Sequence, residues 1–203
     1  MAYTQEAIYN IALNHLGVSA TVQNTSEVNA RTTVLNNQYP LAKERVMKDF
    51  DWNFLNRFQE LTLSTEKCPD PRFKYAYDYP NDCVAARYVV DADGGMYKKF
   101  DVTTDSRGSK LIVCNIAPAI LSYTRNISSE TVKVPETFFT SEFVTALSFY
   151  LAYLSADGIT GASNRKQSCY QSYQMEIAKA KAMNATEASI KDEDESTYLD
   201  SRN

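Results

Sequence analysis

The chain has 203 residues, 44% of them hydrophobic, and a formal net charge of −4. This length fits one domain, or one domain with an insertion, and allows a buried core without disulfide or metal staples. There is no apolar run near the ~20 residues of a membrane span, and the opening MAYTQEAIYN lacks the pattern of a signal peptide. These features exclude a helical membrane protein, and we expect a soluble protein made in the cytosol, with no membrane anchor.

The four cysteines are far apart in the sequence and include no C-x-x-C pair. Zinc sites and dense disulfide frameworks both need closely spaced ligands or partners. We therefore expect free thiols that are mostly buried. The residues concerned are Cys68, Cys83, Cys114 and Cys169.

The negative charge is concentrated at the C-terminal end of the sequence. Residues 187–203 hold six acidic and two basic side chains, whereas the rest of the chain has 19 of each sign. An acidic segment with few aromatic residues buries too little apolar surface to offset its ordering entropy. The sequence therefore predicts a flexible acidic tail from Glu187 to Asn203.

Two helices are predicted in the first part of the chain. Thr4 can cap the first helix, and Gly17 can end it in the left-handed conformation. Ser26 is the expected cap of the second helix, whose apolar positions recur at helical spacing. These positions are Leu35, Tyr39, Ala42, Val46 and Phe50. Because proline has no N–H, Pro40 predicts either a kink or two helices in series.

The middle of the chain reads as β-structure. The segment from Cys68 to Pro80 alternates aromatic residues and is expected to be extended, with one aromatic face. Four strand-like runs follow, separated in part by the turn signals DADGG and TDSRGS, and they favour a small antiparallel meander. The runs are CVAARYVVD, MYKKFDV, KLIVCNI and AILSYTRNI.

Two more helices follow. Pro135 and Glu136 open a helical region with a wide apolar stripe that ends near Gly158, and Gly161 with Ser163 begins a last helix rich in small residues. The expected fold is thus α+β: a mainly α-helical bundle with an inserted small antiparallel β subdomain and the acidic tail. The corresponding ranges are 1–67 and 135–186 for the helical parts, 68–134 for the β insertion and 187–203 for the tail.

The sequence gives little sign of catalysis. His15 is the only histidine, it lies in the middle of the first predicted helix, and no phosphate loop, dinucleotide fingerprint or hydrolase motif is present. Asp78 and Asp82 flank Pro80 in YDYPNDC, where turn capping is a simpler role for them than a carboxylate pair.

A modest basic cluster supports an alternative function. Lys98 and Lys99 lie across a predicted turn from Arg107 and Lys110, and such a hairpin could contact phosphate groups. A solvated hairpin is the commoner structure for this pattern. A non-enzymatic nucleic-acid-binding module built on the Lys98–Lys110 hairpin therefore stays as the alternative hypothesis.

Trp52, the only tryptophan, lies between Phe50 and Phe54 at the expected end of the second helix. A large apolar side chain at a helix end anchors the following segment against the core. We therefore predict that Trp52 is buried and structural.

Two motifs in register resemble a known family. The stretch YPLAKERVMKDFDWNF, from Tyr39 to Phe54, resembles the Y-x-x-x-R-D-x-x-L…W-N-F signature of the tail tubular protein A family, the head-to-tail adaptors of short-tailed bacteriophages. The stretch FKYAYDYPNDC, from Phe73 to Cys83, is similar to that family's Y-A-Y-x-x-P-x-D-C motif. The matching residues are Tyr39, Trp52, Phe54, Tyr75, Tyr77, Pro80, Asp82 and Cys83.

The similarity extends to the last two helices and to the closing ESTYLDSR, which resembles the family's S-W-L-x-A-R. Three residues depart from the family pattern. Lys43 stands where Arg is usual, Tyr198 stands where Trp is usual, and Pro40 lies within the helix.

The resemblance implies a virion structural protein assembled in the host bacterial cytoplasm. Family members form a ring, in this family a dodecamer, beneath the portal protein and above the distal tail (nozzle) protein, and double-stranded DNA passes through it. Tail fibres are a further candidate partner. Neither catalysis nor a cofactor is implied, and Tyr198, Leu199 and Arg202 become the candidate portal-binding residues of the tail.

Overall fold

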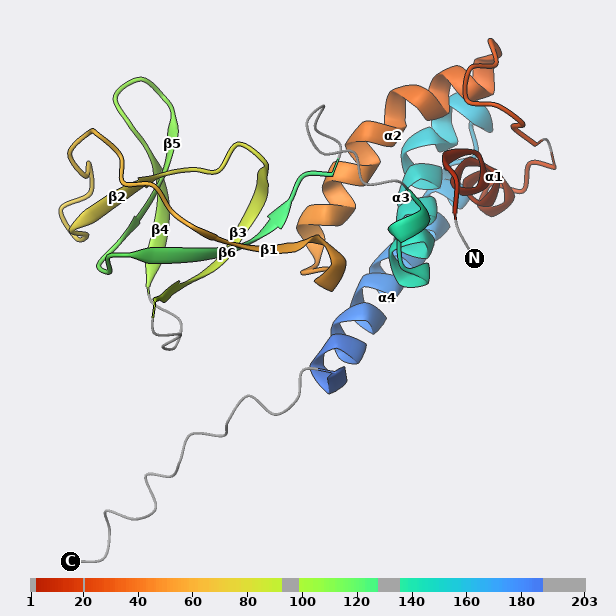
Figure 1. Cartoon of the computed structure of the whole chain (residues 1–203). Coiled ribbons are helices and arrows are strands. Elements are labelled where there is room, and N and C mark those ends of the chain that lie inside the picture. The colour runs from red at the N-terminus through yellow and green to blue at the C-terminus, as the bar shows by residue number, and fades with distance from the viewer. Residues whose placement is uncertain (1–2, 20, 93–98, 128–135, 188–203) are drawn as a thin grey trace, which may run out of the picture.

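The computed structural model describes residues 3–19, 21–92, 99–127 and 136–187. These residues form a helical unit and a β unit that lie side by side (Figure 1). The helices are α1 (Gln5–His15), α2 (Ala30–Asp49), α3 (Ser141–Ile159) and α4 (Ser163–Glu187), with short 3-10 turns at Asn53–Leu55 and Glu136–Phe138. The strands are β1 (Asn56–Glu60), β2 (Tyr75–Asp78), β3 (Cys83–Asp91), β4 (Phe100–Thr104), β5 (Lys110–Cys114) and β6 (Ala119–Arg125). The predicted α+β class, with β-structure inserted between α2 and α3, is confirmed, while the acidic tail lies outside the described residues.

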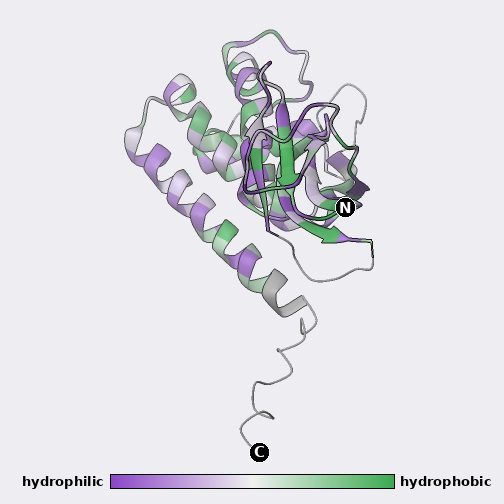
Figure 2. Cartoon of the chain, turned by 90° about the vertical axis from the view of Figure 1, so that its left-hand side faces the viewer, coloured by the Kyte–Doolittle hydropathy of each residue, from purple (hydrophilic) through white to green (hydrophobic). Residues whose placement is uncertain are grey.

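Helix α3 is the centre of the helical unit. It packs against α1, α2 and α4, and its predicted apolar stripe is buried at Phe143, Leu147 and Leu151. Helix α4 also contacts α3, but its C-terminal part continues beyond the other helices (Figure 2). The helical core therefore has one projecting element.

The predicted limits of α1 are confirmed. Thr4 Oγ1 accepts a hydrogen bond from the backbone N–H of Ala7, at 3.2 Å. Gly17, just beyond the helix, has φ of +71°, a conformation that glycine adopts without strain.

The start of α2 differs from the prediction. Its N-cap is Asn29, whose side chain accepts from Thr32 N at 2.9 Å, so the expected cap at Ser26 is wrong. Both residue types can cap a helix, and Ser26 instead belongs to a turn in which its N–H donates to Asn24 Oδ1.

Helix α2 also continues through Pro40 as a single helix, so two helices in series are ruled out. Pro40 lies on the exposed side, where water can satisfy the carbonyl of Asn36 that loses its usual helical partner.

The six strands form two three-stranded sheets, not one meander. The strand orders are β1-β6-β3 and β2-β5-β4, and all pairs are antiparallel. Strands β4 and β5 form the expected hairpin, but β3 pairs with β6 rather than with β4. The first strand starts at Asn56, before the expected boundary at residue 67. Its sequence NRFQE is mostly polar and lacks the apolar–polar alternation that indicates a strand.

The two sheets enclose a shared core, and a smaller core lies on the outer face of the sheet that contains β5. Tyr77, Ile112, Leu121 and Tyr123 are buried between the sheets. The segment before β2 folds over the other face of β5, where Phe73 packs with Leu111 and Val113. Each sheet therefore contributes apolar side chains to a common interior.

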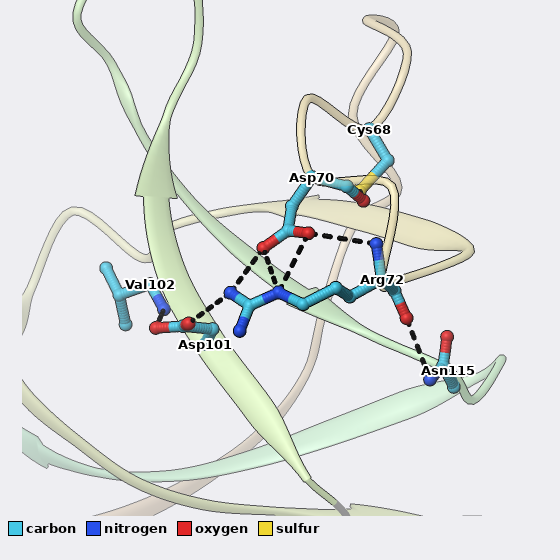
Figure 3. Close-up of polar contacts among 6 residues, drawn as sticks. All are labelled: Cys68, Asp70, Arg72, Asp101, Val102 and Asn115. Carbon is cyan, nitrogen blue, oxygen red and sulfur yellow. Dashed lines mark hydrogen bonds and ion pairs between the residues drawn. The ribbon is translucent and has the colours of Figure 1, made fainter.

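An ion-pair cluster fixes this covering segment (Figure 3). The Arg72 guanidinium lies 2.6 Å from Asp70 Oδ2 and 3.0 Å from Asp101 Oδ2 on β4. Asn115 Nδ2 donates to the carbonyl of Arg72 at 3.4 Å. These contacts join the segment to two neighbouring parts of the β unit.

His15 is the last residue of α1, not a residue in the middle of the helix as predicted, and it packs on α3. Its Nε2 is 3.1 Å from Ser148 Oγ, and its ring stacks on Phe149 with centroids 3.7 Å apart. The buried Ser148 hydroxyl donates to Thr145 O at 2.8 Å, so its oxygen can accept from a neutral His15. Burial lowers the pKa of His15 from 6.5.

This lowered pKa predicts a pH-dependent stability. The unfolded chain binds the His15 proton more tightly, so the contribution is present above about pH 6.5 and is lost as pH falls through the lower folded pKa. In urea titrations, the stability advantage of the parent over His15→Gln should shrink between about pH 7 and about pH 5. An advantage that stays constant would show that native His15 titrates like a solvated imidazole.

Candidate functional site at the junction of the two units

The family-like motif from Tyr39 to Phe54 includes the end of α2, where the chain passes from the helical unit to the β unit. The last four carbonyl groups of a helix have no partner within it and need donors from elsewhere. Trp52 supplies one donor, because its Nε1–H donates to Val46 O at 2.8 Å. The tryptophan therefore folds back and caps the helix that precedes it.

The predicted burial of Trp52 is confirmed. Its side chain is 3% exposed, and its ring meets Phe50 and Phe143 edge-on at centroid distances of 4.7 and 5.1 Å. Phe54 packs on Phe143 at 5.2 Å and belongs to the same core. The sequence predicted this packing but not the hydrogen bond to Val46.

Arg87 on β3 supplies the other donors at this helix end, and the sequence analysis missed it. Its Nη2 lies 2.7 Å from the carbonyl of Phe50, and 3.3 and 3.4 Å from those of Met47 and Lys48. Its Nε donates to Thr124 Oγ1 at 2.8 Å on β6. One guanidinium thus connects α2 to two strands of the β unit.

A sequence signal for Arg87 did exist. It is the only charged residue between Cys83 and Val90, in the otherwise apolar run CVAARYVV. A lone arginine in such a strand needs partners, because a desolvated charge is costly. The sequence gives no indication that the partners are helix carbonyls about 40 residues earlier.

Tyr39 and Lys43, one turn apart on α2, meet Glu136 just before α3. Lys43 is 6% exposed, its Nζ is 3.8 Å from Glu136 Oε1, and Tyr39 Oη donates to the same oxygen at 3.4 Å. Lys43 also lies over the Tyr39 and Phe139 rings. Burial lowers the pKa of Lys43 and raises that of Tyr39. The motif therefore ties α2 to the entrance of α3.

The second motif lies within the β unit. Tyr77 is 1% exposed and donates to Ile116 O at 2.7 Å, while Tyr75 and Cys83 are partly buried against the same core. Pro80 lies in the turn after β2, where its carbonyl accepts from Cys83 N at 3.0 Å. Each of these motif residues has a structural role.

The predicted turn-capping role of Asp82 is wrong. Its carboxylate pairs with Arg57 at 2.8 Å and accepts from Tyr123 Oη at 2.7 Å. Both partners come from other strands, so Asp82 joins β1 and β6 to the start of β3. Burial and the hydrogen bond to Asp82 raise the pKa of Tyr123.

The two motifs do not meet in space as one site. Tyr39, Trp52 and Phe54 belong to the helical core, whereas Tyr75, Tyr77 and Cys83 belong to the core between the sheets. Arg87 bridges the helix end and the sheet. The motifs therefore build the junction and the interior of the units, and their aromatic residues are largely covered.

A small groove opens beside this junction, and we call it the basal groove. It has a volume of about 190 Å³ and lies between the Trp52 turn, the start of α3 and the C-terminal part of α4. Its lining residues are Phe50, Trp52, Asn53, Phe54, Thr140, Glu142, Ala180 and Met183.

A larger cleft, of about 790 Å³, lies in the β unit beside the β4–β5 hairpin. Arg107 and Lys110 of the predicted basic cluster line it. Arg107 pairs with Glu66 at 2.6 Å, and Lys110 lies over the Tyr79 ring at 5.3 Å. Lys99 is exposed, and Lys98 lies outside the described residues. Two of these cations thus already have partners.

Other predicted features can now be placed. All four thiols are free, with Cys114 and Cys169 buried and Cys68 and Cys83 half-buried. Across the described ranges, no group of three or more His, Cys, Asp or Glu could hold a metal ion, and no helix is long and apolar enough to cross a bilayer. The tail candidates Tyr198, Leu199 and Arg202 lie outside the described residues.

The comparisons with known proteins add no family assignment. No protein-family model matches the chain, and no curated protein matches it. The adaptor hypothesis therefore depends on the two motifs and on the way the molecule is built.

The junction predicts a graded response to changes at Trp52. Trp52→Ala should lower the free energy of unfolding by about 3–5 kcal/mol, because it leaves a cavity in the helical core. Trp52→Phe keeps most of the ring but loses the bond to Val46 O, and should cost about 1–2 kcal/mol. Chemical denaturation measures both. A Trp52→Ala variant that unfolds like the parent but fails to assemble would make Trp52 an interface anchor instead.

Arg87 should be more sensitive than a neighbouring arginine to the same substitution. Arg87→Lys keeps the charge but cannot reach Thr124 and the α2 carbonyls together, so it should lower the free energy of unfolding by about 1–3 kcal/mol. Arg57→Lys, at a half-exposed ion pair, is the matched control and should cost under about 1 kcal/mol. If urea denaturation shows that the two variants lose the same free energy of unfolding, the bridging role of Arg87 is contradicted.

Proposed function

We propose that this protein is a ring-forming head-to-tail adaptor of a short-tailed bacteriophage. Twelve copies dock under the portal protein and join it to the distal tail protein, and the genome passes through the ring. The protein is then a structural part of the virion neck, and its work is done by assembly.

The observation that carries the proposal is the position of the motif residues that resemble the adaptor signature. Trp52 caps the end of α2, and Tyr39 with Lys43 fixes the start of α3, so the first motif sets how the β insertion leaves the bundle. A connector that transmits contacts between two partners needs a rigid joint of this kind. The second motif fills the inserted unit's own core.

The outline of the molecule also suits a connector. The β unit lies at one end and α4 projects from the other unit, so different elements can face different neighbours (Figure 1). Outside residues 187–203, the 19 basic and 19 acidic side chains balance. A ring with balanced charge lets duplex DNA slide, because strong phosphate contacts would hold it back.

Sedimentation with purified portal-bearing heads tests the proposal. The 22.9 kDa protein should co-sediment with heads in multiple copies per portal vertex, and should not do so with heads that lack the portal. Filter binding at low salt is the second arm, in which sequence-selective retention of duplex DNA would contradict a channel that passes DNA without reading it. A monomer that does not bind the heads but binds duplex DNA with an affinity that falls as salt rises would favour the alternative nucleic-acid-binding module.

The tail should matter more for attachment than for folding. Deleting residues 192–203 should leave the melting temperature nearly unchanged, because the deleted segment has too few apolar residues for a core. The same deletion should weaken binding to portal-bearing heads, since Tyr198, Leu199 and Arg202 supply an apolar anchor and an ion-pair former. A full-length Tyr198→Ser, Leu199→Ser variant keeps the acidic charge but lacks the apolar anchor. It should therefore also bind portal-bearing heads more weakly than the parent. Parental affinity in both variants would place the portal anchor in the helical body.

A further inference from the structure

The basal groove is too small for an ordinary small-molecule site but suits side chains. Its volume of about 190 Å³ falls below the ~300–1,000 Å³ typical of ligand pockets. Its walls are mainly aromatic and aliphatic, and Met183 on its rim is 50% exposed. Methionine at a rim adapts its shape to an inserted side chain. The groove therefore fits one or two large apolar residues of a peptide segment.

We propose that the occupant is the Tyr198–Leu199 pair of the same chain, held in the groove before the protein assembles. In the sequence after α4, Ile190, Tyr198 and Leu199 are the large apolar residues, and Ile190 is only three residues from the helix end. Tyr198 and Leu199 are adjacent and far enough from α4 to turn back. Docking of this pair would revise the sequence-based prediction of a tail that is flexible along its whole length. A reversible contact made by two side chains adds little to the free energy of unfolding, so the melting temperature expected after the tail deletion stays the same.

The tail starts close to the groove, so Tyr198 and Leu199 can reach it. Met183 precedes the last residue of α4, Glu187, by four residues, or ~6 Å along the helix. Tyr198 follows Glu187 by 11 residues, which can span up to ~36 Å. The tail therefore leaves from the rim of the groove and has ample length to return to it. Such a short tether gives an effective concentration on the order of millimolar.

Charges near the groove match those of the tail. Lys181 is exposed on α4 beside the groove residue Ala180, and Lys179 on the other side of Ala180 is exposed and pairs with Glu176 at 2.7 Å. The acidic run DEDE at 192–195 lies between the helix end and Tyr198 in the sequence. At the other wall, Glu142 is held ionised by hydrogen bonds that lower its pKa, and Arg202 follows Leu199 by three residues. Both ends of the docked segment thus meet opposite charge, and rising salt should weaken the contact.

The contact would keep the anchor pair covered until a partner competes for it. Release of the anchor pair from the groove to the portal rests on the proposed function, whereas docking of the pair in the groove does not. The isolated protein can therefore test the docking, and failure there would leave the adaptor proposal standing.

Disulfide trapping in the full-length chain tests the docking directly. A Met183→Cys, Leu199→Cys variant places one new thiol at the groove rim and one in the tail. The matched control is Met175→Cys, Leu199→Cys, because Met175 is 57% exposed on the same helix but is not a groove residue. Peptide mass mapping separates the new disulfide from any that involves the four native thiols.

We expect an intrachain disulfide between positions 183 and 199, forming about tenfold faster or more than in the control pair. Lys179→Gln with Lys181→Gln in the same background should slow it, as should raised salt. Equal rates in the two pairs, or no disulfide in either, would overturn the proposal. A disulfide between chains would also overturn it, and would place the tail in the groove of a second copy.

Discussion

The unpaired carbonyl groups at the C-terminal end of α2 are the constraint on which the rest of the structure depends. A helix that ends inside a protein must find donors for these groups, because an unsatisfied buried carbonyl costs stability. Trp52 satisfies Val46 from the following turn, and Arg87 satisfies Met47, Lys48 and Phe50 from β3. Because Arg87 belongs to the β unit, capping the helix also fixes where that unit sits.

This arrangement explains how the helical unit and the β unit are held together although each has its own core. The residues of the helical core and those of the core between the sheets form two separate sets, and Arg87 with Thr124 provides a polar link between the two units. The basal groove lies beside the same junction, next to the point where α4 ends. A partner bound there would contact the element that orients the two units, which suits a protein that works by assembly.

Local patterns were sufficient to predict α1, the last two helices, the burial of Trp52 and four of the six strands. Interactions between distant segments were not predictable in this way. Asn29 and Ser26 are equally good caps by residue type, and the polar strand at Asn56 has no visible alternation. The order β1-β6-β3 depends on a shared core, and the role of Arg87 depends on carbonyls of another element. The sequence marks such residues as unusual but does not name their partners.

Electron microscopy of portal-bearing heads incubated with the purified protein tests the central claim most directly. The adaptor account predicts a closed ring of twelve copies beneath the portal, coaxial with a channel wide enough for duplex DNA. Portal vertices that remain bare at saturating protein, while the protein itself is folded, would contradict it.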